Sequence, residues 1–387
     1  MIDVDTALIT DTLRTLVRIN SVNPALDPGG PGEAEIAAWL AARLRALGLK
    51  VAVHEPAAGR PSVVGRLRGR GGGRSLMLNA HTDTVGVTGM ADPFAATIRD
   101  GRLYGRGAYD MKGSLAACIG AAEALVRGGI RLQGDLLLAA VADEEHASLG
   151  TCDVARRYTV DGAIVTEPTG LDLCVAHKGF AWFEVVTRGR AAHGSRPELG
   201  IDANVRMGRV LARIERLASD LETREPHPLL GRGSIHAATL VGGTGLSTYA
   251  AECRLGIERR TLPGDTDAGV ESEIRGLLDG LAAEDPSFQA TMRVLLTRPP
   301  FETRAGSALA AVVTEAIRTV DGTAPRVRGD TPWMDSAVLA EAGADTVVFG
   351  PDGAGAHAVE EWVDLDSVMR AARVLADAAV AWCGTED

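Results

Sequence analysis

One pattern in this sequence constrains the fold more than any other: short aliphatic segments that end in a histidine or a carboxylate. The segments and the polar residues that follow them are 75–80 with His81 and Asp83, 136–141 with Asp143, Glu144 and Glu145, and 163–165 with Glu167. Helical stretches separate these segments, which is typical of buried strands in an open α/β sheet. Because such sheets carry their sites at the carboxyl ends of the strands, we expect the polar residues to share one site.

The pattern changes in the middle of the chain. Strands are expected there at 180–190, 234–242, 250–260 and 289–297, with helices at 201–219 and 267–281. The order βαββαβ is that of a ferredoxin-like antiparallel sheet with two helices. We therefore expect a discontinuous α/β domain, formed by residues 1–177 and 299–387, into which a smaller domain of residues 178–298 is inserted.

Composition excludes several classes of protein. The formal net charge is -11, whereas a nucleic-acid-binding protein needs a basic surface. No apolar run approaches the ~20 residues of a membrane span, and the acidic N-terminus lacks the features of a secretory signal. The five cysteines are scattered and form no Cys-x-x-Cys pair, which favours reduced thiols in the cytoplasm.

Five residues have the chemistry and the placement of metal ligands. Each follows a predicted strand or a glycine-rich loop, and they are His81, Asp110, Glu145, Glu167 and His357. Nitrogen and oxygen ligands without cysteine suit catalytic zinc, and also admit cobalt or manganese. Because this set exceeds what one tetrahedral zinc ion needs, it predicts two metal ions that share a bridging carboxylate and hold one water between them.

The Glu144–Glu145 doublet supplies a group for proton transfer. Neighbouring side chains on an extended segment point in different directions, so one glutamate can bind a metal while the other stays free. A free glutamate beside a metal-bound water can accept its proton and deliver it to a leaving amine. The alternative for the doublet is a solvated pair on the surface. The alternative for His81 and Asp83 is a buried structural pair joined by a hydrogen bond. The position of the doublet at the end of a strand favours a site.

His193 has a different setting from the other histidines. It lies in Ala191–Ser195, a glycine-containing turn after a predicted strand, and such a turn can present an imidazole to a ligand. A structural role within the turn is the alternative.

With these residues identified, the chain resembles the di-zinc family of aminoacylases, acetylornithine deacetylases, succinyl-diaminopimelate desuccinylases and related carboxypeptidases. The matching segments extend over nearly the whole chain and are His81–Asp83, Gly105–Gly113, Asp143–Glu145, Glu167–Thr169, Gly189–Gly194 and Ala356–His357. The resemblance implies a mixed-sheet catalytic domain of the zinc-exopeptidase type. It also implies that the inserted domain is a lid through which the protein forms a homodimer.

The resemblance assigns the ligands to two zinc ions. His81 and Glu167 would hold one ion, Glu145 and His357 would hold the other, and Asp110 would bridge them.

The resemblance also implies roles outside the ligand set. Asp83 would orient the first histidine ligand, and Glu144 would be the general acid and base. His193 would reach the partner subunit's site and stabilise the oxyanion, and Arg260 would bind the substrate carboxylate. The Asp110–Met111 peptide bond would be cis.

The implied activity is hydrolysis of the amide bond of an N-acyl amino acid by a metal-bridged water, in the manner of acetylornithine deacetylase. A dipeptidase or carboxypeptidase using the same residues is the alternative. A catalytically silent binding protein is disfavoured because Glu144 and every expected ligand are present. The chain has Ser247 and Ala250 where many family members have asparagine and proline, so these motifs do not fix the substrate.

Overall fold

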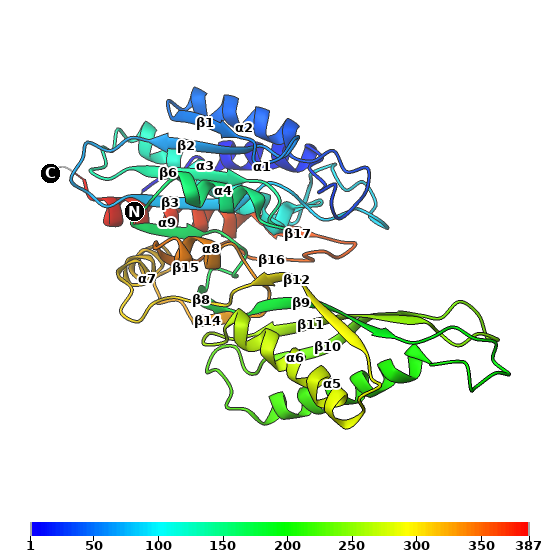
Figure 1. The fold of residues 1–387 in the computed structure, drawn as a ribbon. Helices are drawn as coiled ribbons and strands as arrows, with labels where there is room; N and C mark the ends of the chain where they lie inside the picture. Colours follow the sequence, from blue (N-terminus) through cyan, green and yellow to red (C-terminus); the bar gives the residue numbers. More distant parts are fainter. Residues whose placement is uncertain (1, 386–387) are drawn as a thin grey trace. The chain divides into compact units, whose positions relative to one another are not determined.

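The computed structural model describes residues 2–385, which divide into two compact units. Of the described residues, the first unit comprises 2–175, 303–328 and 334–385, and the second comprises Ala176–Glu302 and Gly329–Trp333. Figure 1 shows the helices and strands of each. Among residues 2–385, no helix is long and apolar enough to cross a membrane.

The first unit is built on a mixed sheet whose central strands are parallel. In spatial order the strands are β1 (Lys50–His54), β2 (Ser62–Leu67), β6 (Leu136–Val141), β3 (Leu76–His81), β7 (Gly162–Val165), β15 (Asp345–Val348) and β8 (Leu173–His177). The short strands β13 (Phe301–Glu302) and β14 (Val327–Asp330) also pair with β8. β6, β3, β7 and β15 run parallel, whereas β1, β2 and β8 pair antiparallel with their neighbours. The predicted α/β class with a mixed sheet is confirmed.

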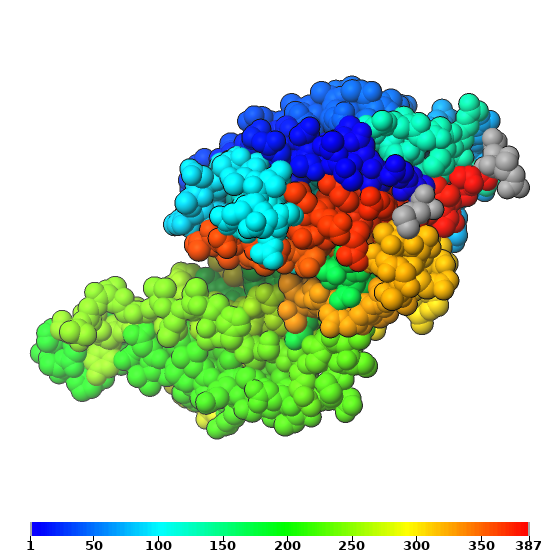
Figure 2. All heavy atoms as spheres, turned by 180° about the vertical axis from the view of Figure 1, so that it is seen from behind, coloured from blue at the N-terminus to red at the C-terminus, as the bar shows by residue number. Residues whose placement is uncertain are grey.

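Successive residues of a strand face opposite sides of the sheet, so apolar side chains point to both sides and helices cover them. On one side, Leu76, Leu78 and Ala80 of β3 belong to a buried apolar core with five helices. These are α1 (Thr6–Arg18), α2 (Ala34–Ala46), α3 (Gly113–Arg127), α7 (Ala308–Asp321) and α9 (Leu365–Cys383). Figure 2 shows the surface of α9, in orange-red, between those of α1 and α7. The shorter helices α4 (Leu149–Arg157) and α8 (Ser336–Glu341) contact β6, β7 and β15.

The helix ends follow local sequence signals. The side chains of Asp5, Ser307 and Asp364 each accept a backbone N–H at the start of α1, α7 and α9. Gly48 follows α2 with a φ of +85°, as expected of a glycine that ends a helix.

A small second sheet lies within the first unit. Its strands, in order, are β16 (Gly353–Ala354), β17 (Trp362–Asp364), β5 (Arg102–Tyr104) and β4 (Thr97–Arg99). The glycine-rich segment 101–110, whose composition is typical of a loop, therefore contains a short strand. Tyr104 pairs with Trp362, and a pairing between such distant segments has no local sequence signal. This pairing brings the chain before Asp110 beside the chain after His357.

The second unit has the predicted βαββαβ order. Its elements are β9 (Gly179–Arg188), α5 (Ala203–Thr223), β10 (Ser234–Gly242), β11 (Glu252–Thr261), α6 (Asp267–Glu284) and β12 (Ala290–Arg298). The sheet is antiparallel with the order β10-β11-β9-β12. Phe183 and Leu255 pack with Val210 and Ile274 of the two helices, so the helices cover one face of this sheet.

Candidate metal centre

The five predicted ligands lie together in the first unit. His81 ends β3, and Glu145 and Glu167 follow the neighbouring strands β6 and β7. Asp110 lies in the turn η1 (Ala108–Lys112) at the start of α3, and His357 lies between β16 and β17. The order of the parallel strands brings the first three ligands together, and the small sheet brings the other two to them.

Asp110 lies between the two histidines. Its Oδ1 is 3.0 Å from Nε2 of His81, and its Oδ2 is 3.4 Å from Nε2 of His357. Oε1 of Glu167 is 3.7 Å from Nε2 of His81, and Oε2 of Glu145 is 3.0 Å from Nε2 of His357. The donor atoms therefore form two groups that share Asp110, which is the arrangement that two metal ions with a bridging carboxylate require.

Glu144 lies beside the first group. Possible ligand atoms of His81, Glu144 and Glu167 lie within 4.8 Å of one another. Glu144 is thus near enough to exchange a proton with a molecule bound at this position, or to bind a metal itself.

The charges of the centre fit a cation. Burial raises the pKa of Glu144 and Glu167 well above the usual value, and the charge of Glu167 adds to the rise at Glu144. Burial and the charge of Asp110 raise the pKa of Glu145. Oε1 of Glu145 is also buried without a hydrogen-bond partner among residues 2–385. Crowded carboxylates of this kind are hard oxygen donors that divalent ions neutralise.

The two histidines respond to the same negative charge. Burial lowers the pKa of His81, but the charge of Glu167 and a hydrogen bond to Asp110 outweigh burial and raise that pKa well above its usual value. Hydrogen bonds to Asp110 and Glu145 raise the pKa of His357 to about 10. Because a metal ion binds neutral imidazole, it would displace these protons.

Asp83 supports both His81 and the glutamate doublet. Nδ1 of His81 donates to the backbone carbonyl of Asp83 at 2.9 Å, so Nε2 is left as the ligand atom. The Asp83 carboxylate lies 3.7 Å from Nδ1. It accepts the backbone N–H groups of Glu144 at 3.1 Å and Glu145 at 3.2 Å. The main chain of Asp83 therefore orients the histidine, and its side chain holds the doublet.

Sequence reasoning missed a layer of buried polar residues behind the doublet. The Asn23 amide donates to Asp83 at 2.8 Å and to Asp143 at 3.0 Å. Arg60 donates two hydrogen bonds to Glu33 and lies 2.7 Å from Asp143. Asn23 precedes a proline, which indicates only a turn. Arg60 and Glu33 do not belong to any sequence motif that predicts a site. Their connection exists only in the folded chain.

The backbone at the site is unusual at three points. Asp143 and His357 have φ values of +69° and +62°. Residues other than glycine rarely adopt this region, and those that do are held by their surroundings and are frequent at functional sites. The Asp110–Met111 peptide bond is cis, as the resemblance implies.

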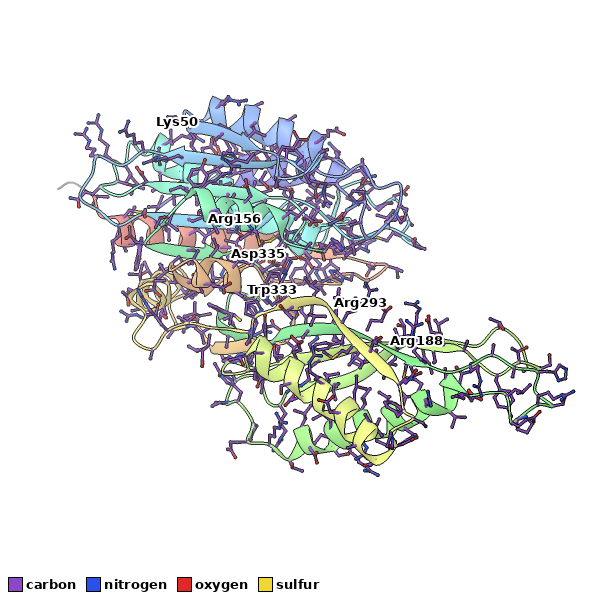
Figure 3. The ribbon with its side chains drawn as sticks, in the orientation of Figure 1. Lys50, Arg156, Arg188, Arg293, Trp333 and Asp335 are labelled. Atoms are coloured by element: carbon purple, nitrogen blue, oxygen red, sulfur yellow. The ribbon has the colours of Figure 1, made fainter. Side chains whose placement is uncertain are left out.

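Asp335 is a further buried carboxyl group near the centre. It precedes α8 and is labelled in Figure 3. The Thr151 hydroxyl donates to Asp335 and accepts from the amide of Asn79 on β3. The negative charge of Asp335 contributes to the raised pKa of Glu144 and Glu167. No sequence motif singled it out as a site residue.

His193 and Arg260 belong to the second unit and lie at opposite ends of its sheet. Arg260 on β11 pairs in register with Phe180 at the start of β9. His193 follows the far end of β9, where it forms a bridge with Thr248 and its ring contacts the Ser195 hydroxyl.

The two adjacent arginines of β11 face opposite sides of the sheet. Arg259 is 1% exposed and pairs with Glu273 of α6. Arg260 is one of the residues on the other face, where its side chain is 33% exposed and pairs with Glu258. Of the two, only Arg260 is accessible to a ligand.

Known proteins are similar to this chain over most of its length. Over 330 residues, covering 82% of each chain, the protein is 32% identical to acetylornithine deacetylase of Myxococcus xanthus. It is 30% identical over 378 residues to succinyl-diaminopimelate desuccinylase of Parvibaculum lavamentivorans, with 93% of this chain and 91% of the relative covered. It is 28% identical over 381 residues to N-formyl-4-amino-5-aminomethyl-2-methylpyrimidine deformylase of Bacillus subtilis, with 90% and 89% covered.

The fold is shared with solved structures of peptidases. Aminopeptidase PepT of Bacillus cereus superposes with a TM-score of 0.80 at 20% identity, covering 98% of this chain and 99% of that one. A dinuclear metal-binding peptidase from the M20 family of Bacillus subtilis superposes with a TM-score of 0.76 at 17% identity, covering 98% and 99%. Residues 77–381 match the model of peptidase family M20/M25/M40. The chain therefore belongs to peptidase family M20/M25/M40 and is a metal-dependent hydrolase of amide bonds.

Proposed function

We propose that this protein removes the acyl group from an N-acyl amino acid, as an acetylornithine-deacetylase-like deacylase. The observation that carries the proposal is the centre in which Asp110 faces both histidines while Glu144 lies beside one of them. Similarity to two relatives named as a deacetylase and a desuccinylase supports the deacylase over the peptidase.

Two zinc ions would occupy the centre, and cobalt or manganese could replace them. His81 and Glu167 would hold one ion, Glu145 and His357 the other, with Asp110 shared. When bound, such ions polarise a carbonyl and make a water a better nucleophile near neutral pH.

Glu144 would carry the proton during hydrolysis. It would accept a proton from the attacking water and donate it to the nitrogen of the leaving amino acid, because an amine leaves readily only when protonated. The place of Glu144 beside His81 and Glu167 favours this role, because it is within reach of a water bound at that position.

In this proposal the second unit contributes residues to two different sites. Arg260 would pair with the free carboxylate of the substrate, and His193 would donate to the oxyanion. Arg260 pairs with Phe180 near the start of β9, and His193 follows the end of β9 at Arg188. The eight residue steps from Phe180 to Arg188 span roughly 25 Å. An N-acyl amino acid is too short to contact both residues of one chain. His193 would therefore serve the partner's substrate in a homodimer.

The edge strand β10 is suited to such a dimer. Within residues 2–385 it pairs only with β11, and Leu240 and Val241 near its end are 54% and 69% exposed. An exposed apolar edge strand is a ready partner for the same strand of a second copy.

Ser247 and Ala250, which depart from the family pattern, lie in the loop between β10 and β11. The carbonyl of Ser247 accepts the N–H of Gly194, which places this loop beside His193 within the second unit. We propose a cytoplasmic location because the five cysteines are scattered along the chain and form no Cys-x-x-Cys pair.

A substrate panel with metal analysis tests the proposal. Purified protein loaded with zinc would be assayed on N-acetyl, N-succinyl and N-formyl amino acids and on dipeptides of the same amino acids. We expect hydrolysis of at least one N-acyl amino acid and a smaller kcat/KM for the dipeptides. Faster cleavage of the dipeptides would replace the deacylase with a peptidase, and absence of bound metal would remove the proposed mechanism.

A further inference from the structure

The Glu361 carboxylate accepts an unusual number of hydrogen bonds. It is 1% exposed, and its Oε2 accepts from Nη1 of Arg106 at 2.6 Å and from the backbone N–H of Gly107 at 3.0 Å. Its Oε1 accepts the backbone N–H groups of Tyr109 at 2.9 Å and Asp110 at 3.0 Å. Four donors converge on this one side chain: two are backbone N–H groups of η1, which carries Asp110, and a third is that of Gly107, which directly precedes η1.

These contacts fix the main chain on both sides of the turn. Gly107 has a φ of +78°, and a Cβ there would lie 2.7 Å from the Thr84 side chain, so the chain is tightly packed at this point. Backbone N–H groups that point at one carboxylate cannot rotate without breaking charge-assisted hydrogen bonds, which are stronger than neutral ones. The direction of the Asp110 side chain is thus set by the position of the Glu361 carboxylate.

Glu361 also belongs to the segment that carries His357. Glu361 follows His357 by four residues, and its backbone carbonyl accepts the N–H of Gly105 at 3.1 Å. Arg106, which pairs with the Glu361 carboxylate, donates a second bond to the carbonyl of Ala358 at 2.9 Å. Glu361 and Arg106 therefore tie the turn of Asp110 to the connection that contains His357.

We infer that Glu361 is a positioning residue for the metal centre: it holds Asp110 and His357 at the separation that two metal ions need. The inference rests on the proposed function, because it assumes that these two residues bind metal. A ligand held in place loses little freedom when the metal binds, whereas a loosened ligand must be ordered at that moment and binds more weakly. A merely structural ion pair with Arg106 would stabilise the fold equally with and without metal.

The test compares three variants whose changes are matched. Glu361→Asp keeps the charge beside Arg106 and withdraws the carboxylate by one methylene. Glu361→Gln keeps the size and removes the charge. Glu360→Gln makes the same change on the adjacent, exposed side chain and is the control. Zinc affinity is measured by competition with a chromophoric chelator, and thermal unfolding is followed for each metal-free and zinc-loaded protein.

We expect zinc to bind about 10- to 100-fold more weakly to Glu361→Asp and Glu361→Gln, the range seen when a residue that supports a ligand is removed. The rise in Tm on zinc loading should shrink in both variants. Glu360→Gln should match the wild type. Unchanged zinc affinity in the aspartate variant would overturn the inference. So would a failure of both Glu361 variants to fold, because the carboxylate would then be needed for the fold itself.

The outcomes separate this inference from the proposed function. If the wild-type protein binds no zinc, the proposed metal centre fails. If the wild type and both Glu361 variants bind zinc equally, the centre stands and only the role of Glu361 fails.

Discussion

The two units hold their predicted site residues in opposite ways. In the first, His81 is 1% exposed, and the Asp83 carboxylate behind it accepts hydrogen bonds from Asn23 and from the backbone of the doublet. In the second, His193 lies on an exposed turn and Arg260 on an open face of the sheet. In the proposed function, the metal ligands all come from the first unit, and the second unit supplies groups that contact the substrate. Substitutions of the proposed ligands in the first unit should change metal content, whereas those of His193 and Arg260 in the second unit should change only kinetics.

The largest expected effect separates the two glutamates of the doublet. Glu144→Ala should keep both metal ions and lose about 10²–10⁴-fold in kcat, the usual cost of a missing general acid and base. Glu145→Ala should lose metal as well, because its carboxylate lies 3.0 Å from His357 in the second ligand group. Elemental analysis and kcat measurements on both proteins decide this. Equal metal loss in the two variants would show that Glu144 is a ligand.

Next in size is the effect of His193. His193→Ala should keep its metal and lose about 10²–10³-fold in kcat, as expected when one oxyanion donor is removed. Mixed with Glu144→Ala under subunit exchange, it should regain activity, because a mixed dimer has one site with both residues intact. Half of the dimers are mixed and one of their two sites is complete, so activity should return to about a quarter of the wild-type value. No recovery despite proven exchange would place His193 in its own chain's site.

A smaller effect is expected at Arg260. Arg260→Ala should raise KM by about 10- to 100-fold, since a hydrogen bond between charged groups contributes about 1.5–3 kcal/mol. Metal content should not change. Arg254→Ala is the matched control, because Arg254 is half exposed on the same face of β11 and pairs with Glu252 and Glu184. A KM that rises equally in both variants would point to a general charge effect rather than to a substrate contact.

The smallest effect concerns pH and belongs to the first unit alone. The pKa of His357 in the metal-free protein is about 10, above the ordinary value of 6.5, so its imidazole is protonated at neutral pH. Zinc must displace that proton, and the competition weakens as the pH rises toward 10. Zinc affinity should therefore increase with pH, by about tenfold per pH unit for one displaced proton. Calorimetry in two buffers of different ionisation enthalpy counts the protons released, and an affinity independent of pH would contradict the shift.

Local sequence signals predicted much of the fold and singled out the candidate ligands. The aliphatic segments 76–80 and 136–141 form β3 and β6, and the alternating segments 180–190 and 250–260 form β9 and β11, because the period of apolar residues is set by the geometry of each element. Three candidate ligands, His81, Glu145 and Glu167, could be named because polar residues at the ends of parallel strands meet at one edge of the sheet. β5 could not be foreseen, since its partner β17 is far along the chain.

By itself, then, the sequence determined the α/β class, the inserted βαββαβ order and the five candidate ligands. Only the tertiary structure decided how those ligands are held. Asn23 donates to Asp83, and Arg60 pairs with Asp143 beside the doublet. Glu361 accepts the backbone N–H of Asp110. In each case the partner comes from a distant part of the chain. Hydrogen bonds between distant segments depend on where the folded chain brings each side chain, and neither spacing nor periodicity contains that information.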